Sequence, residues 1–233
     1  MTRSIKAQGI ILTRTNFGEA DRILMFITAE HGKIKAIAKA VRKSQSKLAG
    51  GIELFSVSHL TFIIGKGDIG TLISTRLKKH YGNIVKDIDR TNMAYEFMRL
   101  INKNTEEAAD SSYFHLLRQG LESLDDLKLD SGLVGLWFQM QLLKLTGHAP
   151  NLHTDVKGAK LTDSASYDFT HEGMHFVPRL AKEGAYHANH IKFLRLGFGV
   201  SDPVVLQRVQ DVQKPAEATR PLVHSMLQSF LRQ

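Results

Sequence analysis

The sequence predicts an α+β protein of two domains: a five-stranded β-barrel of the OB type over residues 1–80, then an α-helical bundle over residues 81–233. Short apolar runs separated by glycines fill the first part, and apolar residues at helical spacing fill the second. The charge changes at the same place. Residues 1–80 contain 14 Lys and Arg against 5 Asp and Glu, whereas the rest of the chain contains 17 against 18.

Five runs of strand length predict the barrel. They cover residues 9–12, 23–27, 33–39, 54–64 and 70–77. His31-Gly32 separates the second run from the third, and residues 65–68 separate the fourth from the fifth, so both pairs are expected to form hairpins. Short strands joined by tight turns suit a small closed barrel.

Residues 65–70 (GKGDIG) have the spacing of a dinucleotide-binding loop. That motif must open a helix, but the residues that follow it, TLIST at 71–75, are β-branched and strand-like. We therefore assign the segment to a hairpin turn and expect its glycines to adopt positive φ angles.

Four apolar stripes at helical spacing predict the helices of the second domain. They are Ala94, Phe97, Met98 and Ile101; Tyr113, Leu117, Leu121 and Leu124; Leu133, Leu136, Trp137, Met140 and Leu143; and Leu222, Met226, Leu227, Phe230 and Leu231. Asp110 or Ser111 is expected to cap the second helix, and Gly147 to end the third. Thr219 and Pro221 suit the start of the last. Because isolated helices of this length are marginal in water, we expect the stripes to be buried together in one bundle.

A polar insert over residues 148–178 interrupts the helical pattern, and alternation at 167–169 and 176–177 predicts a hairpin within it. The insert contains HEGMH at 171–175. On a helix, His171 and His175 would lie one turn apart on zinc, with Glu172 as the general base. Gly173 and the surrounding hairpin pattern favour a loop instead, and a zinc-dependent hydrolase stays open as an alternative.

The chain has no cysteine, which excludes disulfides, thiol catalysis and cysteine-based metal sites. No apolar stretch approaches the ~18 residues that a membrane helix needs, and the N-terminus has no apolar signal segment. We therefore expect a soluble, cytoplasmic protein with no membrane contact, no cofactor and no metal.

Cationic side chains of the first domain form the candidate nucleic-acid site. On the strand at 33–39, lysines alternate with small apolar residues, so the lysines share one face. This row continues into a polar loop, and long cationic side chains on a strand and a loop can follow a phosphate chain without a fixed base register. The predicted DNA-binding residues are Lys33, Lys35, Lys39, Arg42, Lys43, Lys47, Arg14, Lys66 and Arg76.

Two other interpretations of the basic surface stay open. Lysines on an edge strand also block unwanted strand pairing, and a basic face could hold an acidic partner protein in a non-catalytic scaffold. No nucleophile with a base, carboxylate pair or phosphate-cradling loop stands out in the sequence, so we expect no enzymatic activity.

Aromatic residues that could stack on bases are few in residues 1–80, which contain Phe17, Phe26, Phe55 and Phe62 but no Tyr or Trp. Phe26 and Phe62 lie within apolar runs and are expected in the core. Binding should therefore depend on the backbone charge and tolerate single and double strands. If about half of the 14 cations meet phosphates, the salt slope on single strands should be about −5.

The N-terminal residues resemble the bacterial DNA repair proteins of the RecO family. The resemblance is dense over residues 8–55, and the helical part is similar to the family's C-terminal domain in layout. The matching segments are 9–12 (GIIL), 17–24 (FGEADRIL), Thr28, 32–34 (GKI), 38–43 (AKAVRK), 46–48 (SKL) and Gly50.

The resemblance implies a recombination mediator that is not an enzyme. Such a protein binds single- and double-stranded DNA, anneals complementary strands and helps to load RecA together with RecR. It also contacts the C-terminal tail of the single-stranded DNA-binding protein, and it is cytoplasmic and nucleoid-associated. The family's basic segment falls on Lys39, Arg42, Lys43 and Lys47, whereas Glu19, Asp21 and Arg22 match the signature but suit a turn and a charge pair.

Two departures from the family pattern affect what the resemblance implies. Many members carry a four-cysteine zinc site in the insert, and because this chain has no cysteine that expectation does not transfer. Ala40 stands where glycine is common, so we expect the backbone at this position not to need a positive φ angle.

Overall fold

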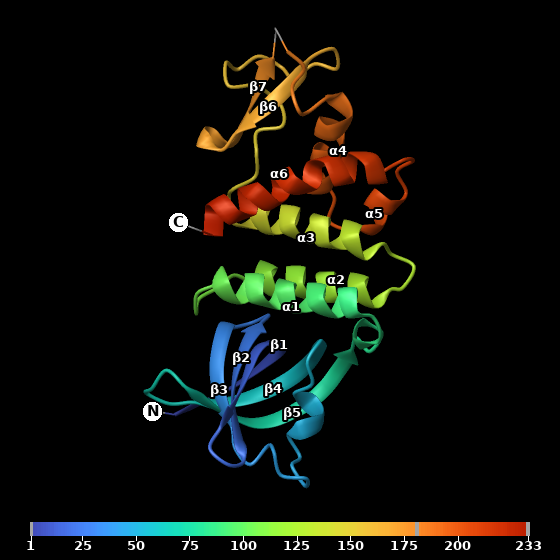
Figure 1. Ribbon diagram of the computed structural model, residues 1–233. Coiled ribbons are helices and arrows are strands. Elements are labelled where there is room, and N and C mark those ends of the chain that lie inside the picture. The colour runs from blue at the N-terminus through green and yellow to red at the C-terminus, as the bar shows by residue number, and fades with distance from the viewer. Residues whose placement is uncertain (1, 180–181, 232–233) are drawn as a thin grey trace. The chain divides into compact units, whose positions relative to one another are not determined.

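The computed structural model describes residues 2–179 and 182–231, apart from the side chain of residue 231. Two compact units divide the chain, Met1–Leu127 and Lys128–Gln233 (Figure 1). None of the described helices combines the length and the apolar character that crossing a membrane requires. The two units are taken in turn below.

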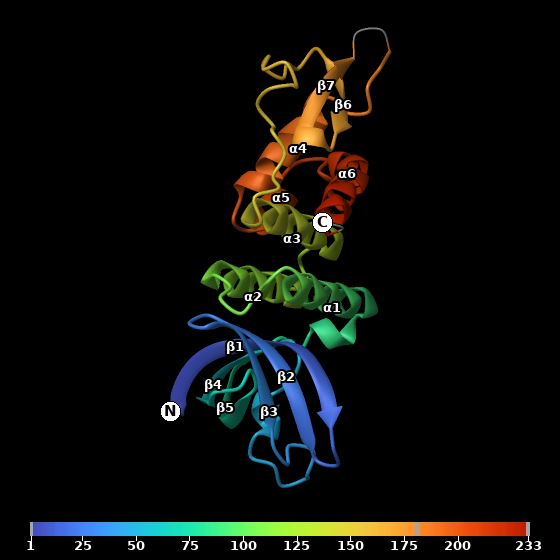
Figure 2. The same ribbon diagram turned by 90° about the vertical axis from the view of Figure 1, so that its left-hand side faces the viewer.

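Five strands close into a barrel in the order β1-β2-β3-β5-β4, with β4 pairing back onto β1 (Figures 1 and 2). All pairs are antiparallel except β3 with β5. The strands are β1 (Arg3–Phe17), β2 (Asp21–Thr28), β3 (Gly32–Ala38), β4 (Ser56–Ile64) and β5 (Gly70–His80). The predicted fold class, a five-stranded barrel followed by helices, is confirmed.

The barrel core consists of inward-facing apolar side chains of all five strands. Phe26 and Phe62 lie at its centre, fully buried, with ring centroids 5.4 Å apart in an edge-to-face arrangement. Burying a side chain of this size stabilises the fold by about 1.5–3 kcal/mol. Small residues of β3, Ala36 and Ala38, leave room for these rings.

Two helices, α1 (Ile88–Lys103) and α2 (Ser111–Asp125), belong to the same compact unit as the barrel and lie over one of its ends (Figure 1). Asp87 caps α1 through the amides of Asp89 and Arg90, and Asp110 caps α2 through the amide of Ser112. The compact units divide after Leu127, so two of the four predicted helices belong to each unit.

The second unit packs α3 (Ser131–Leu145) against α4 (Ala188–Gly199) and α6 (Gln213–Leu231), with the short α5 (Val204–Gln207) between the last two. Trp137 of α3 is buried and donates its indole N–H to the Val200 carbonyl at 3.1 Å. Gly147 ends α3 with a φ angle of 79°, as expected of a glycine after a helix. The predicted hairpin is present as β6 (Ser166–Thr170) and β7 (His175–Arg179), with Phe169 opposite Phe176.

The predicted start of the last helix is wrong. α6 begins at Gln213, so Thr219 and Pro221 lie inside the helix. Thr219 is buried and donates its hydroxyl to the Pro215 carbonyl at 2.7 Å, one turn earlier. Pro221 is exposed. A proline inside a helix lacks the N–H that would bond to the carbonyl four residues earlier, and on the exposed side of a helix that carbonyl is accessible to solvent.

The glycines of residues 65–70 do connect two strands, β4 and β5, but none of them has a positive φ angle. At Gly70 an added Cβ would lie 2.6 Å from the end of the Ile64 side chain, which would have to move, and 3.3 Å from the Ile63 carbonyl oxygen. A positive φ angle occurs instead at Gly32, the first residue of β3, where φ is 64°.

Replacing Gly32 by alanine should destabilise the first unit. An added Cβ would lie 2.3 Å from the Glu107 carbonyl oxygen, and the backbone is left-handed, so we expect a loss of about 2 kcal/mol or more in the free energy of unfolding. Gly50→Ala is the matched control, because nothing lies within 4 Å of its added Cβ and its φ is not positive. Equal denaturation midpoints for the two variants would contradict this account.

Candidate nucleic-acid interface

The outer face of β2 and β3 carries the predicted row of lysines. Ile34, Ala36 and Ala38 are buried, whereas Lys35 and Lys39 are exposed, as the alternation of residues predicts. In the register of the two strands, Lys35 lies opposite Met25, two pairs away from the half-buried Ile23 and Ile37 and therefore on the same face. The exposed cations therefore stand on a partly apolar surface.

Lys33 differs from the rest of the row. Its ammonium donates to the carbonyls of Asn102, at 2.7 Å, and Thr105, at 3.1 Å, and its backbone amide donates to the Glu107 carbonyl. Burial lowers the pKa of Lys33, and the nearby Glu107 carboxylate partly opposes that shift. This lysine ties the connection between α1 and α2 to the barrel, and we leave it out of the proposed interface.

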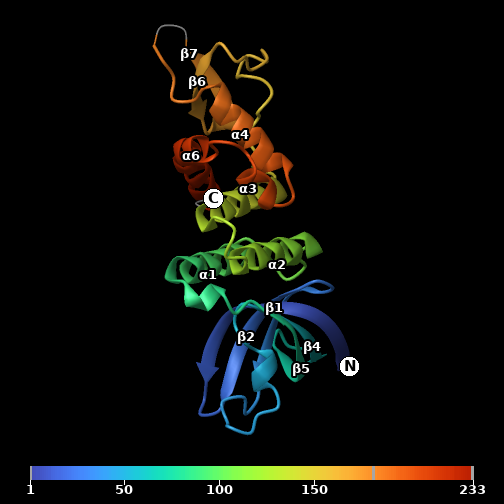
Figure 3. The ribbon, with the colours of Figure 1, turned by 90° about the vertical axis from the view of Figure 1, so that its right-hand side faces the viewer.

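The loop after β3 and the hairpin between β1 and β2 lie together at the end of the barrel away from α1 and α2 (Figures 1 and 3). Arg42 joins them, because its backbone amide donates to the Ala20 carbonyl at 2.9 Å and its guanidinium to the Gly18 carbonyl at 3.2 Å. Asp21 accepts a further bond from the Ala40 amide at 2.7 Å. We call the cations gathered here the basic end: Arg14, Arg22, Lys39, Arg42, Lys43 and Lys47.

Three arginines of the basic end influence one another. Burial lowers the pKa of Arg22, and the positive charges of Arg14 and Arg42 lower it further, against the attraction of Glu53. Arg22 also donates to Asn16 at 3.2 Å, its partner across the hairpin. In the sequence, Arg22 suits a turn and a charge pair, whereas the structure places it in β2, opposite Asn16. The hairpin register brings residue 22 close to residues 14 and 16.

The basic end has no carboxylate partner at ion-pair distance. Throughout the described part of the chain, ion pairs within 4.0 Å join residues between 87 and 192, and none involves a lysine or arginine of β1 to β5 or of the loops between them. Glu19 and Glu53 lie nearby and are exposed. The positive potential at this end is therefore largely uncompensated.

The structure separates the remaining predicted residues from the basic end. Lys66 lies in the turn between β4 and β5. Near it, Lys35 lines a shallow depression together with Arg3 and the acidic residues Asp68 and Glu107. Arg76 lies on β5, in a second depression that also contains Lys6, His59 and Glu30. The predicted site residues thus occupy three places on the barrel. Acidic residues lie near all three, and the basic end gathers six cations against the nearby Glu19, Asp21 and Glu53.

The expectation for Ala40 is wrong. This residue has a φ angle of 54°, in the left-handed region that glycine adopts most easily. The bond from its amide to Asp21 holds the strained conformation, which starts the loop that carries Arg42, Lys43 and Lys47.

The HEGMH segment does not have the geometry of a zinc peptidase. Glu172–Met174 is a single 3-10 turn with left-handed φ angles at Gly173 and Met174, and His175 already belongs to β7. His171 contacts the Ser225 hydroxyl at 3.1 Å. Within residues 2–179 and 182–231, no three His, Asp or Glu side chains lie close enough together to hold a metal ion. These observations do not support the hydrolase interpretation.

Two family models match this chain. The model described as "Recombination protein O N terminal" matches residues 1–81, and the model described as "Recombination protein O C terminal" matches residues 85–195. The chain belongs to the RecO family. Proteins of this family act in DNA repair and recombination. The two family models meet close to residue 80, whereas the compact units divide after Leu127.

Curated relatives named DNA repair protein RecO support the assignment. The chain is 36% identical over 148 residues to one from Dehalococcoides mccartyi, and 34% identical over 151 residues to one from Desulfatibacillum aliphaticivorans. These alignments cover 63% and 64% of the chain, and in both cases 58% of the relative's own length. The RecO protein of Alkaliphilus metalliredigens is 28% identical over 98% of the chain and 91% of its own length.

The contacts of Lys33 lead to a stability prediction. Lys33→Met should lower the free energy of unfolding by about 1–3 kcal/mol, because it leaves two partly buried carbonyls without their donor. Lys35→Met, on the exposed part of the same strand, should change it by less than about 0.5 kcal/mol. Chemical denaturation of both variants measures this, and equal effects would show that Lys33 has no special structural role.

Proposed function

We propose that this chain is a DNA-binding recombination mediator without catalytic activity, and that the basic end and Lys35 hold the sugar-phosphate backbone of single- and double-stranded DNA. The observation that carries the proposal is the set of cations at one end of the barrel that have no carboxylate partner at ion-pair distance. A cation in water can bind a phosphate without first breaking an ion pair. Each such contact releases counterions from the nucleic acid, which favours binding.

Contacts of this kind suit strand annealing. Two complementary strands repel each other through their phosphates, and base pairing supplies all the sequence specificity that annealing needs. A protein that neutralises phosphates and leaves the base edges free therefore promotes pairing. We extend the proposal to annealing, to work with RecR and to loading of RecA, as the resemblance to the family implies. A DNA-binding role also suits a cytoplasmic protein that associates with the nucleoid.

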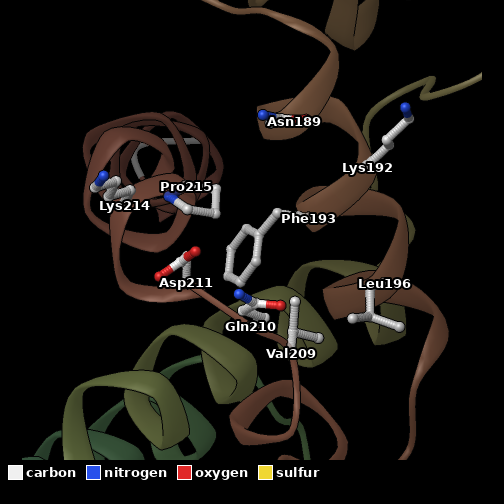
Figure 4. A pocket seen from close by; sticks show the side chains of 9 residues that line it. All are labelled: Asn189, Lys192, Phe193, Leu196, Val209, Gln210, Asp211, Lys214 and Pro215. Carbon is white, nitrogen blue, oxygen red and sulfur yellow. The ribbon is translucent and has the colours of Figure 1, made fainter.

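The second unit offers a site for a partner peptide. A cavity of about 700 Å³ lies between α4 and the start of α6 (Figure 4). Phe193, Leu196 and Pro215 give it apolar walls, and Asp211 also lines it. Its two cations are Lys214 and Lys192, and Lys192 is paired with Asp163 at 2.6 Å. Apolar walls with cations nearby suit a peptide that is acidic and ends in apolar residues. We propose that this cavity receives the C-terminal tail of the single-stranded DNA-binding protein.

Removing three cations from the loop tests the DNA-binding proposal. With Arg42, Lys43 and Lys47 replaced together by alanine, we expect affinity for a fluorescent single strand to fall at least about tenfold at ~100 mM salt, and the salt slope to become shallower by about 2, because each lost phosphate contact contributes about 0.7. Titration at several salt concentrations measures both.

A matched variant controls for net charge. Lys157, Lys160 and Lys182, exposed in the second unit, are replaced together by alanine, which removes the same charge from another place. The control should bind DNA as the parent does. Equal losses in both variants would mean that only net charge matters. If the parent chain binds DNA no better than an unrelated basic protein at about 150 mM salt, the basic face serves an acidic protein instead.

Charge reversal at the rim of the cavity tests the peptide proposal. Replacing Lys192 and Lys214 with glutamate should weaken binding of a synthetic acidic peptide with an apolar C-terminus about tenfold or more, because two attractions become repulsions. The control is a variant with Lys157→Glu and Lys160→Glu, which changes the net charge of the protein by the same amount. Unchanged peptide affinity in the Lys192 and Lys214 variant would rule out this cavity.

A further inference from the structure

Phe17 stands out among the aromatic residues of the barrel. In residues 2–81, which the structure describes throughout, Phe26, Phe55, Phe62 and Tyr81 are at most 2% exposed, whereas the side chain of Phe17 is 52% exposed. A half-exposed phenylalanine forgoes much of the stabilisation that complete burial gives, so it adds less to the stability of the fold than the buried rings do. Its position therefore has to be explained by something other than the core.

Phe17 lies among the residues of the basic end. It is the last residue of β1, opposite Asp21, at the tip of the hairpin that belongs to the basic end. Its two chain neighbours are both held by arginines, because Arg22 donates to Asn16 and Arg42 donates to the Gly18 carbonyl. The chain on either side of Phe17 is thus held by two arginines of the basic end, while the Phe17 side chain itself is exposed.

From this juxtaposition we infer that Phe17 stacks on an unpaired base of a single strand whose phosphates are held by Arg14, Arg22 and Arg42. An aromatic ring beside cations is the arrangement with which proteins bind single-stranded nucleic acid, because every base has a π-face and every nucleotide a phosphate. Bases within a duplex already stack on their neighbours, so the ring discriminates in favour of single strands. This inference rests on the proposed function and adds a strand preference to it.

Stacking of this kind is compatible with annealing. The ring covers the face of one base and leaves its Watson–Crick edge open to a complementary strand. When the duplex forms, the base returns to its own stack and the contact with Phe17 is lost. The basic end would then hold the product less tightly than the single strand, which favours release.

Phe17→Leu tests the inference, because leucine keeps an apolar side chain and removes the ring without changing the charge. Three fluorescent probes of equal length are compared: a single strand of thymidines, an abasic strand and a duplex. We expect affinity for the thymidine strand to fall roughly fivefold to a hundredfold, the range for loss of one stacked base. Affinity for the abasic strand and the duplex should not change, and neither should the salt slope.

Fluorescence gives a second measurement that does not depend on affinity. In Phe17→Trp, binding of the thymidine strand should quench the new indole, while the abasic strand should not. The natural Trp137 is 1% exposed and lies in the second unit, so it serves as a constant background.

The outcomes separate this inference from the proposed function. If the triple alanine variant loses affinity but Phe17→Leu binds all three probes like the parent, the basic end binds DNA and the stacking inference fails alone. Equal losses on all three probes would also overturn it, because a base is then not what the ring contacts. If the parent chain binds none of the probes, both proposals fail. Thermal unfolding of Phe17→Leu, expected to match the parent, shows that the fold is intact.

Discussion

Closure of the barrel is the constraint on which the arrangement of the first unit depends. β1 spans 15 residues and pairs with β4 through its first half and with β2 through its second. Once the ring is closed, alternate residues of β3 must face the interior or the solvent. The apolar residues Ile34, Ala36 and Ala38 then fill the core, whereas Lys35 between them and Lys39 after them face the solvent. The charged side chains of β3 therefore lie on the outer face of the barrel, because apolar side chains fill its interior.

The two compact units use charge differently. In the second unit, Arg179 pairs with Asp168 and Lys192 with Asp163, so cations and carboxylates offset one another locally. In residues 2–81, which the structure describes throughout, no arginine lies within 4.0 Å of a carboxylate. Arg14 and Arg42 repel Arg22, and this repulsion contributes to its lowered pKa. Bringing like charges together costs free energy in the isolated protein, and a polyanion is the ligand that would recover it.

Local patterns predicted much of this fold. The alternation in β3, the hairpin of the insert with Phe169 opposite Phe176, and the buried stripe of α1 all follow from spacing alone. Lys33 could not be separated from Lys35 in this way, because the carbonyls that engage it belong to residues about 70 positions away. Phe17 was counted with the other phenylalanines, since its exposure depends on where the hairpin turns. The start of α6 was missed because a proline inside a helix looks, in sequence, like the proline that begins one.

The left-handed backbone of Ala40 limits which residues this position can accept. For an alanine the conformation costs about 1–2 kcal/mol relative to an ordinary one, and the carboxylate of Asp21 keeps it in place. Glycine would relieve that cost without moving Lys39 or Arg42, whereas a valine or isoleucine would have to rotate the chain and carry both cations away from the hairpin. Turn geometry therefore limits which residues fit at position 40, in the middle of a segment whose other role is to carry Lys39 and Arg42.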